Sequence, residues 1–344
     1  MKRFIVILTV IALTGSAGAQ GFTKVGTSAA QFLKFPVDAR TAALAGTHSG
    51  IYGDVASLYW NPAGIAAVDR LSVAFSYLNL YVGIQHSFMG IVAKVGRNSA
   101  VGVSAIVLDS GEIEQTTVAR PEGTGALFRV RNYAFGLSYA RYMTEWVMLG
   151  ATVKYVQEDL WNETATGVAV DIGSVLETGI LGVKLGMNIS NFGTDLRLEG
   201  EDLRFHLDVK DPSDPDVVKY TIPRGGELKT EPWPMPWRFQ AGLAIDLVGG
   251  SSRLVESDIH RVTFLGQYDE LNDAGARGNF GVEYQWNNTL SGRIGNYSNA
   301  DSPRFSAGLG LSFRLAGRRF DLDYALVDYG RLDAVHHTTL GITF

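Results

Sequence analysis

The sequence contains no cysteine, which excludes disulfides, thiolate metal sites and cysteine nucleophiles. This absence suits an exported bacterial protein, which crosses a membrane unfolded and must not form bridges on the way. Proline is scarce, with 10 residues against 40 glycines in a chain of 344, so the composition does not indicate disorder. There is no excess of basic residues, because the net charge is −5. Nucleic acid is therefore not an expected partner.

Long hydrophobic runs are also missing beyond the first twenty residues, so no helix is expected to span a bilayer after export. The one apolar run, FIVILTVIALTGS, follows Lys2 and Arg3 and precedes the small residues Ala17-Gly18-Ala19. This order is typical of a secretory signal peptide with its cleavage site. We expect residues 1–19 to be a signal peptide and the mature chain to begin near Gln20. A retained membrane anchor is the alternative.

From Leu71 onward the chain alternates apolar with small or polar residues, as β-strands do. In the segment 279–286, for example, Phe280, Val282, Tyr284 and Trp286 alternate with polar or small residues. A soluble β-sandwich shows the same alternation, so the pattern alone does not decide the fold. About fourteen candidate strands begin near residues 71, 83, 99, 131, 145, 165, 180, 237, 253, 276, 289, 303, 318 and 335.

The connections between these strands alternate in length, and this favours a membrane barrel. Outer-membrane barrels have short periplasmic turns and longer extracellular loops. The two faces of the strands support the same interpretation. Large apolar residues share one face, and many small or polar residues share the other, which predicts a wide or plugged lumen. The expected short turns are 96–99, 143–144, 177–179, 249–252, 287–288 and 316–317, and the expected long loops are 109–130, 158–164, 191–236, 269–275, 298–302 and 328–334.

The last strand supports the same interpretation, because Leu340, Ile342 and Phe344 alternate with polar or small residues and the chain ends on an aromatic. This ending resembles the terminal strand of bacterial outer-membrane barrels. We therefore predict an all-β fold: a transmembrane antiparallel β-barrel of about fourteen strands over residues 71–344, embedded in outer-membrane lipid. Its long connection 191–236 is charged and proline-rich, and we expect it to be a functional extracellular loop.

Candidate catalytic and metal-ligating residues are few. The adjacent His336 and His337 point to opposite faces of a strand, so they do not easily share one metal. Asp258 and His260 would share a strand face, yet no GxSxG elbow supplies a nucleophile. We expect no catalysis and no cofactor, with an outer-membrane hydrolase as a remote alternative.

One loop gathers carboxylates at Asp208, Asp211, Asp214 and Asp216. Their oxygens would suit surface calcium, but the spacing does not match an EF-hand loop and the prolines indicate turns. A solvated loop is the expectation, with calcium as the alternative.

Residues 20–70 precede the barrel and lack the strand pattern. A short helix is expected over the Ala42-Ala43-Leu44 stretch, ended by Gly46. Just before it, Asp38 and Arg40 are expected to pair with each other or to bond to the lumen wall.

The stretch SLYWNPAGIA, residues 57–66, contains a large aromatic and a rigid turn. Trp60 is expected to wedge into the barrel interior. Asn61 precedes Pro62 and is therefore expected to be extended, while Gly64 offers a positive φ that other residues avoid.

The order of these residues, after a signal peptide and before a barrel, resembles the PorV/PorQ family. That family belongs to a FadL-like group of fourteen-stranded outer-membrane barrels, in which an N-terminal hatch with an N-P-A-type turn sits at the barrel mouth. The resemblance implies that residues 20–70 form a hatch with short helical segments. It assigns as hatch or lumen residues Phe32, Asp38, Arg40, Gly46, Asp54, Ser57, Trp60, Asn61, Pro62 and Gly64.

The resemblance implies a component of type IX secretion that binds or shuttles cargo proteins at the cell surface. Its partners would be the C-terminal signal domains of secreted cargo and the large translocon barrel. The alternative implied by FadL-like relatives is a channel for hydrophobic small molecules, with a hydrophobic ligand in the lumen. An apolar lumen pocket near the hatch would favour the channel.

Overall fold

The computed structural model describes residues 25–209, 222–250, 254–298 and 303–344, and the expected signal peptide lies outside these ranges. The side chains of residues 205–225 are also outside the description. Among the described residues, no helix is long and apolar enough to cross a bilayer.

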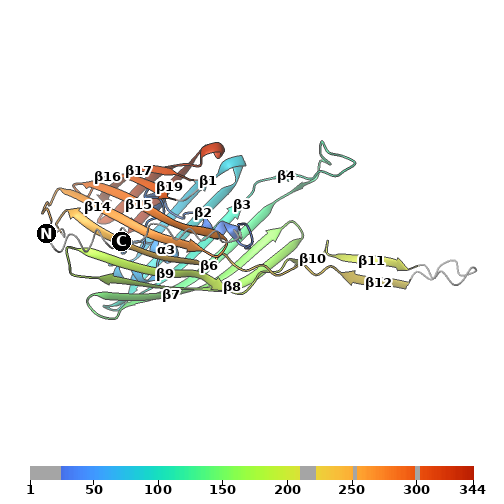
Figure 1. Ribbon diagram of the computed structural model, residues 1–344, viewed down its shortest axis with the longest axis horizontal. Helices are drawn as coiled ribbons and strands as arrows, with labels where there is room; N and C mark the ends of the chain where they lie inside the picture. The colour runs from blue at the N-terminus through green and yellow to red at the C-terminus, as the bar shows by residue number, and fades with distance from the viewer. Residues whose placement is uncertain (1–24, 210–221, 251–253, 299–302) are drawn as a thin grey trace, which may run out of the picture.

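A closed antiparallel β-barrel forms the body of the protein (Figure 1). In the main sheet of the described chain, β10 pairs only with one end of β8, and the other fourteen strands close into a cylinder. The first strand pairs with the last, with Ser72 opposite Thr343. The barrel strands are β1 Ser72–Asn79, β2 Gln85–Val95, β3 Ser99–Asp109, β6 Val130–Tyr142, β7 Val147–Leu160, β8 Glu163–Glu177, β9 Val183–Gly193, β13 Arg238–Val248, β14 His260–Leu271, β15 Ala274–Trp286, β16 Leu290–Ser298, β17 Phe305–Leu315, β18 Arg318–Asp328 and β19 Ala334–Thr343.

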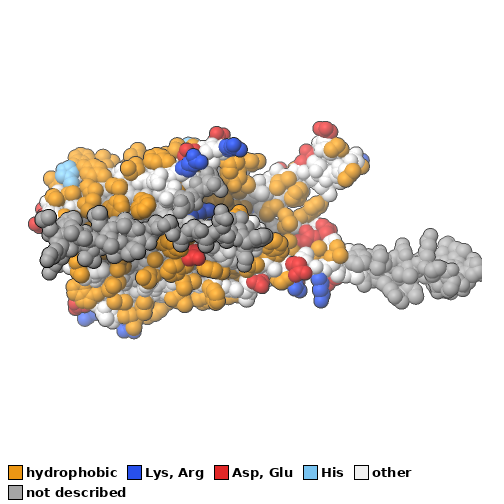
Figure 2. Space-filling view, in the orientation of Figure 1, with side chains coloured by type: hydrophobic (Ala, Val, Ile, Leu, Met, Phe, Trp, Pro, Cys, Tyr) orange, Lys and Arg blue, Asp and Glu red, His pale blue; other side chains and the backbone are white. Residues whose placement is uncertain are grey.

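The outer face of the wall is apolar, as the alternation predicted. Phe135, Leu137 and Ile172 are 51%, 64% and 63% exposed, although each lies in the middle of a strand. Figure 2 shows hydrophobic side chains over much of the visible wall, with charged side chains gathered toward its ends and on the projecting loops. This is the surface of a barrel that is solvated by lipid.

The two ends of the barrel differ. One end, the long-loop end, carries the hairpin of β4 (Ile113–Glu114) and β5 (Leu127–Phe128) and the connection 194–237, which contains β10 (Glu199–Gly200), β11 (Arg204–Val209) and β12 (Ile222–Glu227). Both hairpins project well beyond the rim (Figure 1). The other end, the short-turn end, holds the C-terminus and turns such as 96–98 and 316–317. By the rule for outer-membrane barrels, the long-loop end faces the cell surface.

Three expected connections were wrong in length. Residues 158–164 and 269–275 were expected to be long loops, but the strands continue to two-residue turns, with Leu160 opposite Glu163 and Leu271 opposite Ala274. The connection at 249–252 was expected to be short. It extends to residue 259, so β14 begins at His260 rather than near residue 253. Gly249 there donates to the carbonyl of Val255 at 3.0 Å, which places Val255 beside the end of β13.

The described segment 25–70, called the hatch below, contains short helices and no strand. Its elements are η1 Gln31–Lys34, α2 Ala39–Ala43, α3 Ser57–Trp60 and η2 Pro62–Ala67; two further single turns, η3 Tyr81–Gly83 and η4 Gly330–Leu332, lie in loops at the long-loop end. The hatch is almost wholly buried inside the barrel, with Leu33, Leu44 and Ile65 at 0–1% exposure. The core of the protein is therefore the contact between the hatch and the inner wall.

Candidate functional site

The hatch runs through the lumen from the long-loop end to the short-turn end. At the long-loop end, Gln31 and Lys34 donate to Asp273, in the β14–β15 turn, at 2.8 and 2.5 Å. At the short-turn end, the Tyr52 hydroxyl donates to Glu177, the last residue of β8, at 2.8 Å. The described part of the hatch is thus held at both mouths of the barrel.

Inward-facing glycines of the wall receive the hatch backbone. A Cβ at Gly150 of β7 would lie 2.5 Å from the backbone nitrogen of Ala63, and a Cβ at Gly186 of β9 would collide with the carbonyl of Ser49. The small residues predicted for the inner face therefore allow the hatch to pack closely against the wall, and they do not line an open channel. The wall glycines whose added Cβ would meet the hatch are Gly90, Gly102, Gly150, Gly173, Gly186, Gly242, Gly281, Gly295 and Gly308.

Asp38 organises the centre of the hatch. It caps α2, because its carboxylate accepts from the backbone nitrogen of Thr41 at 2.8 Å, and it also accepts from Trp60 Nε1 at 2.7 Å. Asp38 is 4% exposed. Asp38 and Arg40 do not pair with each other, which was one of the two expectations. Asp38 bonds within the hatch, and Arg40 bonds to the wall.

Trp60 lies in the barrel interior, where it is 2% exposed. The His48 ring stacks on it at a centroid distance of 6.1 Å, and the Tyr59 ring meets it edge-on at 4.8 Å. The Arg238 guanidinium of β13 lies 5.2 Å from its ring centroid. Trp60 therefore fixes the hatch to the wall by a cation–π contact as well as by packing.

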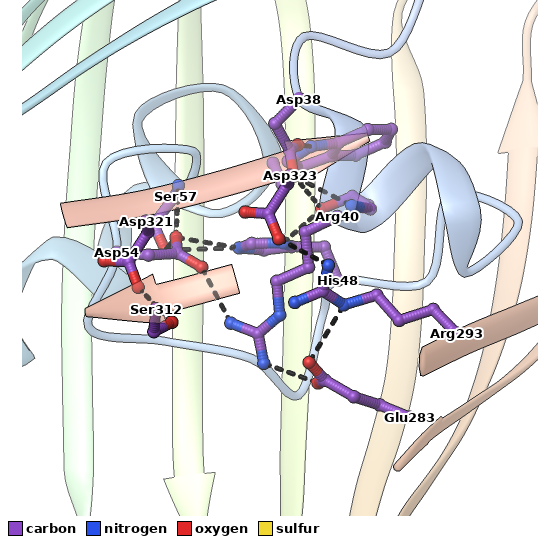
Figure 3. A network of polar contacts seen from close by, with 12 residues as sticks. Asp38, Arg40, His48, Asp54, Ser57, Glu283, Arg293, Ser312, Asp321 and Asp323 are labelled. Carbon is purple, nitrogen blue, oxygen red and sulfur yellow. Dashed lines mark hydrogen bonds and ion pairs between the residues drawn. The ribbon is translucent and has the colours of Figure 1, made fainter. Parts of the chain in front are cut away.

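A chain of alternating charges joins the hatch to three wall strands (Figure 3). Arg40 donates to Asp54 of the hatch at 3.5 Å and to Glu283 of β15 at 2.7 Å. Arg293 of β16 then donates to Glu283 at 3.0 Å and to Asp323 of β18 at 2.5 Å. The side chains of Arg293 and Glu283 are only 5% and 7% exposed, so each charge relies on its neighbours.

The negative charge of Asp54 is stabilised by this series of ion pairs. Burial alone would raise the pKa of the Asp54 carboxyl, but His48, Arg40 and the hydrogen bond from Ser57 together hold that pKa well below its usual range. Burial opposes the charge of Arg40, yet Glu283 and Asp54 raise the pKa of its guanidinium. Both groups are therefore charged at neutral pH.

His48 and Ser57 lie in contact inside the hatch. His48 Nε2 is 3.2 Å from the Ser57 hydroxyl, which itself donates to Asp54 at 2.9 Å. Ser57 is fully buried and His48 is 1% exposed, so no substrate reaches them in this conformation. Ser57 serves to hold Asp54 at the start of α3.

The Asn61-Pro62-Ala63-Gly64 turn is built differently from the prediction at one position. Asn61 is extended, with φ −161° and ψ 100°, and its side chain donates to the carbonyl of Ser174 on β8 at 3.0 Å. Pro62 opens η2 against the wall. Gly64 was expected to use a positive φ and does not. It is required for space, since a Cβ there would lie 2.6 Å from the Ser57 hydroxyl.

The two remaining residues of the predicted hatch set are structural. Phe32 is 2% exposed and packs in the main buried cluster. Gly46 has φ 76°, and its carbonyl accepts from Gln267 of β14 at 3.0 Å. A residue with a Cβ would be strained at this φ.

Several wall residues that complete the site were not predicted. Glu283 and Asp323 carry a recognisable signal, because each is a charged residue on the inward face of a strand whose outward face is apolar. The hatch partner of Glu283, Arg40, is 243 positions away in sequence, and no local pattern identifies it.

The other candidate positions do not gather into a site. His337 is buried and His336 is exposed, in agreement with opposite faces of a strand. Asp258 precedes β14 and so does not share a strand face with His260, which binds the Tyr284 hydroxyl on the outer wall at 2.9 Å. Asp211, Asp214 and Asp216 lie outside the described residues, as does the side chain of Asp208. Across the described residues no cluster of three metal-ligating side chains occurs.

Comparison with known proteins identifies both the family and the fold. The family described as type IX secretion system protein PorV matches residues 18–195, which is more than half of the chain. The comparison with curated proteins found no match. Similar solved structures include the CymD monoaromatic hydrocarbon channel (TM-score 0.55, 12% identity, 89% of this chain and 96% of that chain).

Two further solved structures have the same barrel. The Pseudomonas putida toluene transporter TodX matches with a TM-score of 0.55 and 13% identity over 89% of this chain and 96% of that chain. A Pseudomonas aeruginosa FadL homologue matches with a TM-score of 0.54 and 11% identity over 90% and 98%. At these identities the likeness concerns the fold, which is the FadL-like outer-membrane barrel.

Proposed function

Because this chain belongs to the family of the type IX secretion system protein PorV, we propose that it binds secreted proteins at the cell surface. In this role the barrel is an anchor in the outer membrane, and the loops at the long-loop end make the contacts. The protein acts by binding and scaffolding, without catalysis. The expected partners are the C-terminal signal domains of cargo and the translocon barrel through which cargo arrives.

The observation that carries the proposal is the combination of a filled lumen with projecting hairpins. Nine inward-facing glycines contact the hatch, and the ion pairs from Arg40 to Asp323 tie it to the wall. Meanwhile the β4–β5 hairpin and the β11–β12 hairpin extend beyond the rim (Figure 1). A barrel built this way offers a partner its outer loops more readily than its interior.

The deletion strain provides the test. Without the protein, signal-bearing cargo is expected to accumulate in the periplasm, and the intact gene should restore secretion. A version lacking residues 201–229, which include β11 and β12, should insert as a heat-modifiable barrel yet fail to restore secretion. Unchanged secretion in the deletion strain would remove the proposal.

The alternative is a channel for hydrophobic solutes, as the CymD and TodX names state for those proteins. The filled, ion-paired lumen speaks against it, and two depressions of the described surface are lined by wall and turn residues rather than by the hatch. Measured uptake of a hydrocarbon that depends on this protein, with co-purified apolar ligand, would favour the channel instead.

A further inference from the structure

The long connection does not simply leave the barrel rim; its two ends fold back into the lumen. Residues 194–198 and 231–237 are called the loop base below. Leu196 and Trp233 exchange two backbone hydrogen bonds of 2.8 Å, which close the loop base into a bridge. Leu196 and Met235 are each 2% exposed and belong to the same buried cluster as Phe32 and Leu33 of the hatch.

The loop base is bonded directly to the first described turn of the hatch. The backbone nitrogen of Ala29 donates to the carbonyl of Pro234 at 2.9 Å. Asn272 donates from its side chain to the carbonyl of Met235 at 2.9 Å. Its neighbour Asp273 accepts from Lys34 at 2.5 Å, so one two-residue turn holds both the loop base and the hatch.

A buried ion pair fixes the point at which the connection departs from the wall. Lys154 of β7 and Asp171 of β8 lie 2.6 Å apart, at 4% and 0% side-chain exposure. Asn191, with φ 58°, donates its backbone nitrogen to Asp171 and its side chain to the carbonyl of Pro236. The β8–β9 register shifts here. This register shift is a β-bulge, and it sets the direction in which both ends of the connection leave the barrel.

The same ion pair also touches the hatch. Lys154 Nζ lies 5.7 Å from the ring centroid of Tyr59, whose hydroxyl donates to the carbonyl of Leu33 at 2.6 Å. A displacement of the loop base would thus disturb the seat of Tyr59 and, through it, the stretch around Leu33.

We infer that the loop base and the outer part of the hatch, residues 28–35, form one cooperative unit, so that the position of the loop base and the closure of the barrel are thermodynamically coupled. By linkage, a partner that holds the loop base in one position shifts the hatch, and loosening the hatch alters the affinity for that partner by the same factor. The identity of the partner rests on the proposed function, whereas the coupling does not.

Hydrogen exchange on the purified barrel tests the coupling without any partner. Gly167 of β8 lies against the loop base, and a Cβ there would be 2.6 Å from the Met235 methyl. Gly167→Val is therefore expected to push on the loop base without touching the hatch. Exchange of the amides in residues 28–35 should accelerate at least about tenfold, since local opening controls their protection. Gly292→Val, at a wall glycine with open space around it, is the matched control and should leave these amides unchanged.

The reverse direction is tested by Lys34→Ala, which is expected to accelerate exchange at the amides of Leu196 and Trp233. Peptides from β15 and β16 report global unfolding in every variant. If Gly167→Val accelerates exchange everywhere, Met235→Ala, which removes volume and inserts none, replaces it. The coupling would be overturned if Gly167→Val accelerated exchange only in the loop base and Lys34→Ala accelerated exchange only in residues 28–35. The secretion proposal would be untouched by that result.

Discussion

Arg40 of the hatch and Glu283 of β15 are joined by an N–O contact of 2.7 Å across 243 positions of sequence. The contact continues through Arg293 to Asp323, so a hatch residue is tied to strands β15, β16 and β18 of the wall. The attachment of the hatch is therefore ionic on the β15–β18 side of the lumen.

Removing Arg40 should loosen the hatch without unfolding the barrel. Arg40→Ala leaves Glu283, which is 7% exposed, with one cationic partner. We expect the free energy that holds the hatch to the wall to fall by about 2 kcal/mol, a value discounted for the 32% exposure of Arg40 itself. The measurement is exchange protection of residues 39–48, together with conductance in planar bilayers. Arg120→Ala, in the β4–β5 hairpin, is the surface control. Equal protection in the two variants would contradict an ionic attachment.

Trp60 allows packing to be separated from hydrogen bonding. Trp60→Ala removes the largest side chain of the hatch centre and should cost about 3–5 kcal/mol, as for other buried aromatics. Trp60→Phe keeps a ring between His48 and Arg238 but leaves Asp38 without its Nε1 donor, at about 1–3 kcal/mol. Thermal unfolding of the detergent-solubilised barrel ranks the two. A larger loss for Trp60→Phe would contradict the packing role.

The hatch should loosen in acid because of Asp54. The folded state holds the pKa of Asp54 below its unfolded value, so its contribution is present above about pH 4 and is lost as the pH falls further. Exchange protection of residues 48–60 should therefore decline below about pH 4. Asp54→Asn should start from lower protection and show a smaller decline. An identical pH profile in the variant would assign the acid response to other groups.

Wall glycines should be intolerant of side chains. Gly150→Val places a side chain where the backbone of Pro62 and Ala63 lies, and overpacking of this kind costs about 1–3 kcal/mol. We expect a displaced hatch, seen as channel openings in planar bilayers. Gly292→Val faces open space and is the control. Closed, wild-type behaviour of Gly150→Val would show that the hatch adapts to the wall.

The barrel was largely predictable because successive residues of a strand point to opposite faces, so alternation in the sequence reveals each strand. Strands expected near residues 99 and 318 begin at Ser99 and Arg318. The errors fell where alternation gives no information, such as the two-residue turn after Leu160 and the delayed start of β14 at His260.

The site was predictable only in part, for a physical reason. Asn61 is extended because a proline follows it, and that constraint is local. The need for a glycine at position 64 arises from Ser57, and the partners of Arg40 are on distant strands. Such contacts depend on which residues the closed cylinder brings opposite one another.

The pairing of β1 with β19 has a consequence for biogenesis. The wall becomes a cylinder only when the last strand of the chain meets the first, with Ser72 opposite Thr343. The hatch is synthesised before every strand and runs from one mouth of the barrel to the other. The hatch lies inside this cylinder, so its contacts with the wall, such as that of Arg40 with Glu283, are complete only once β1 and β19 have paired.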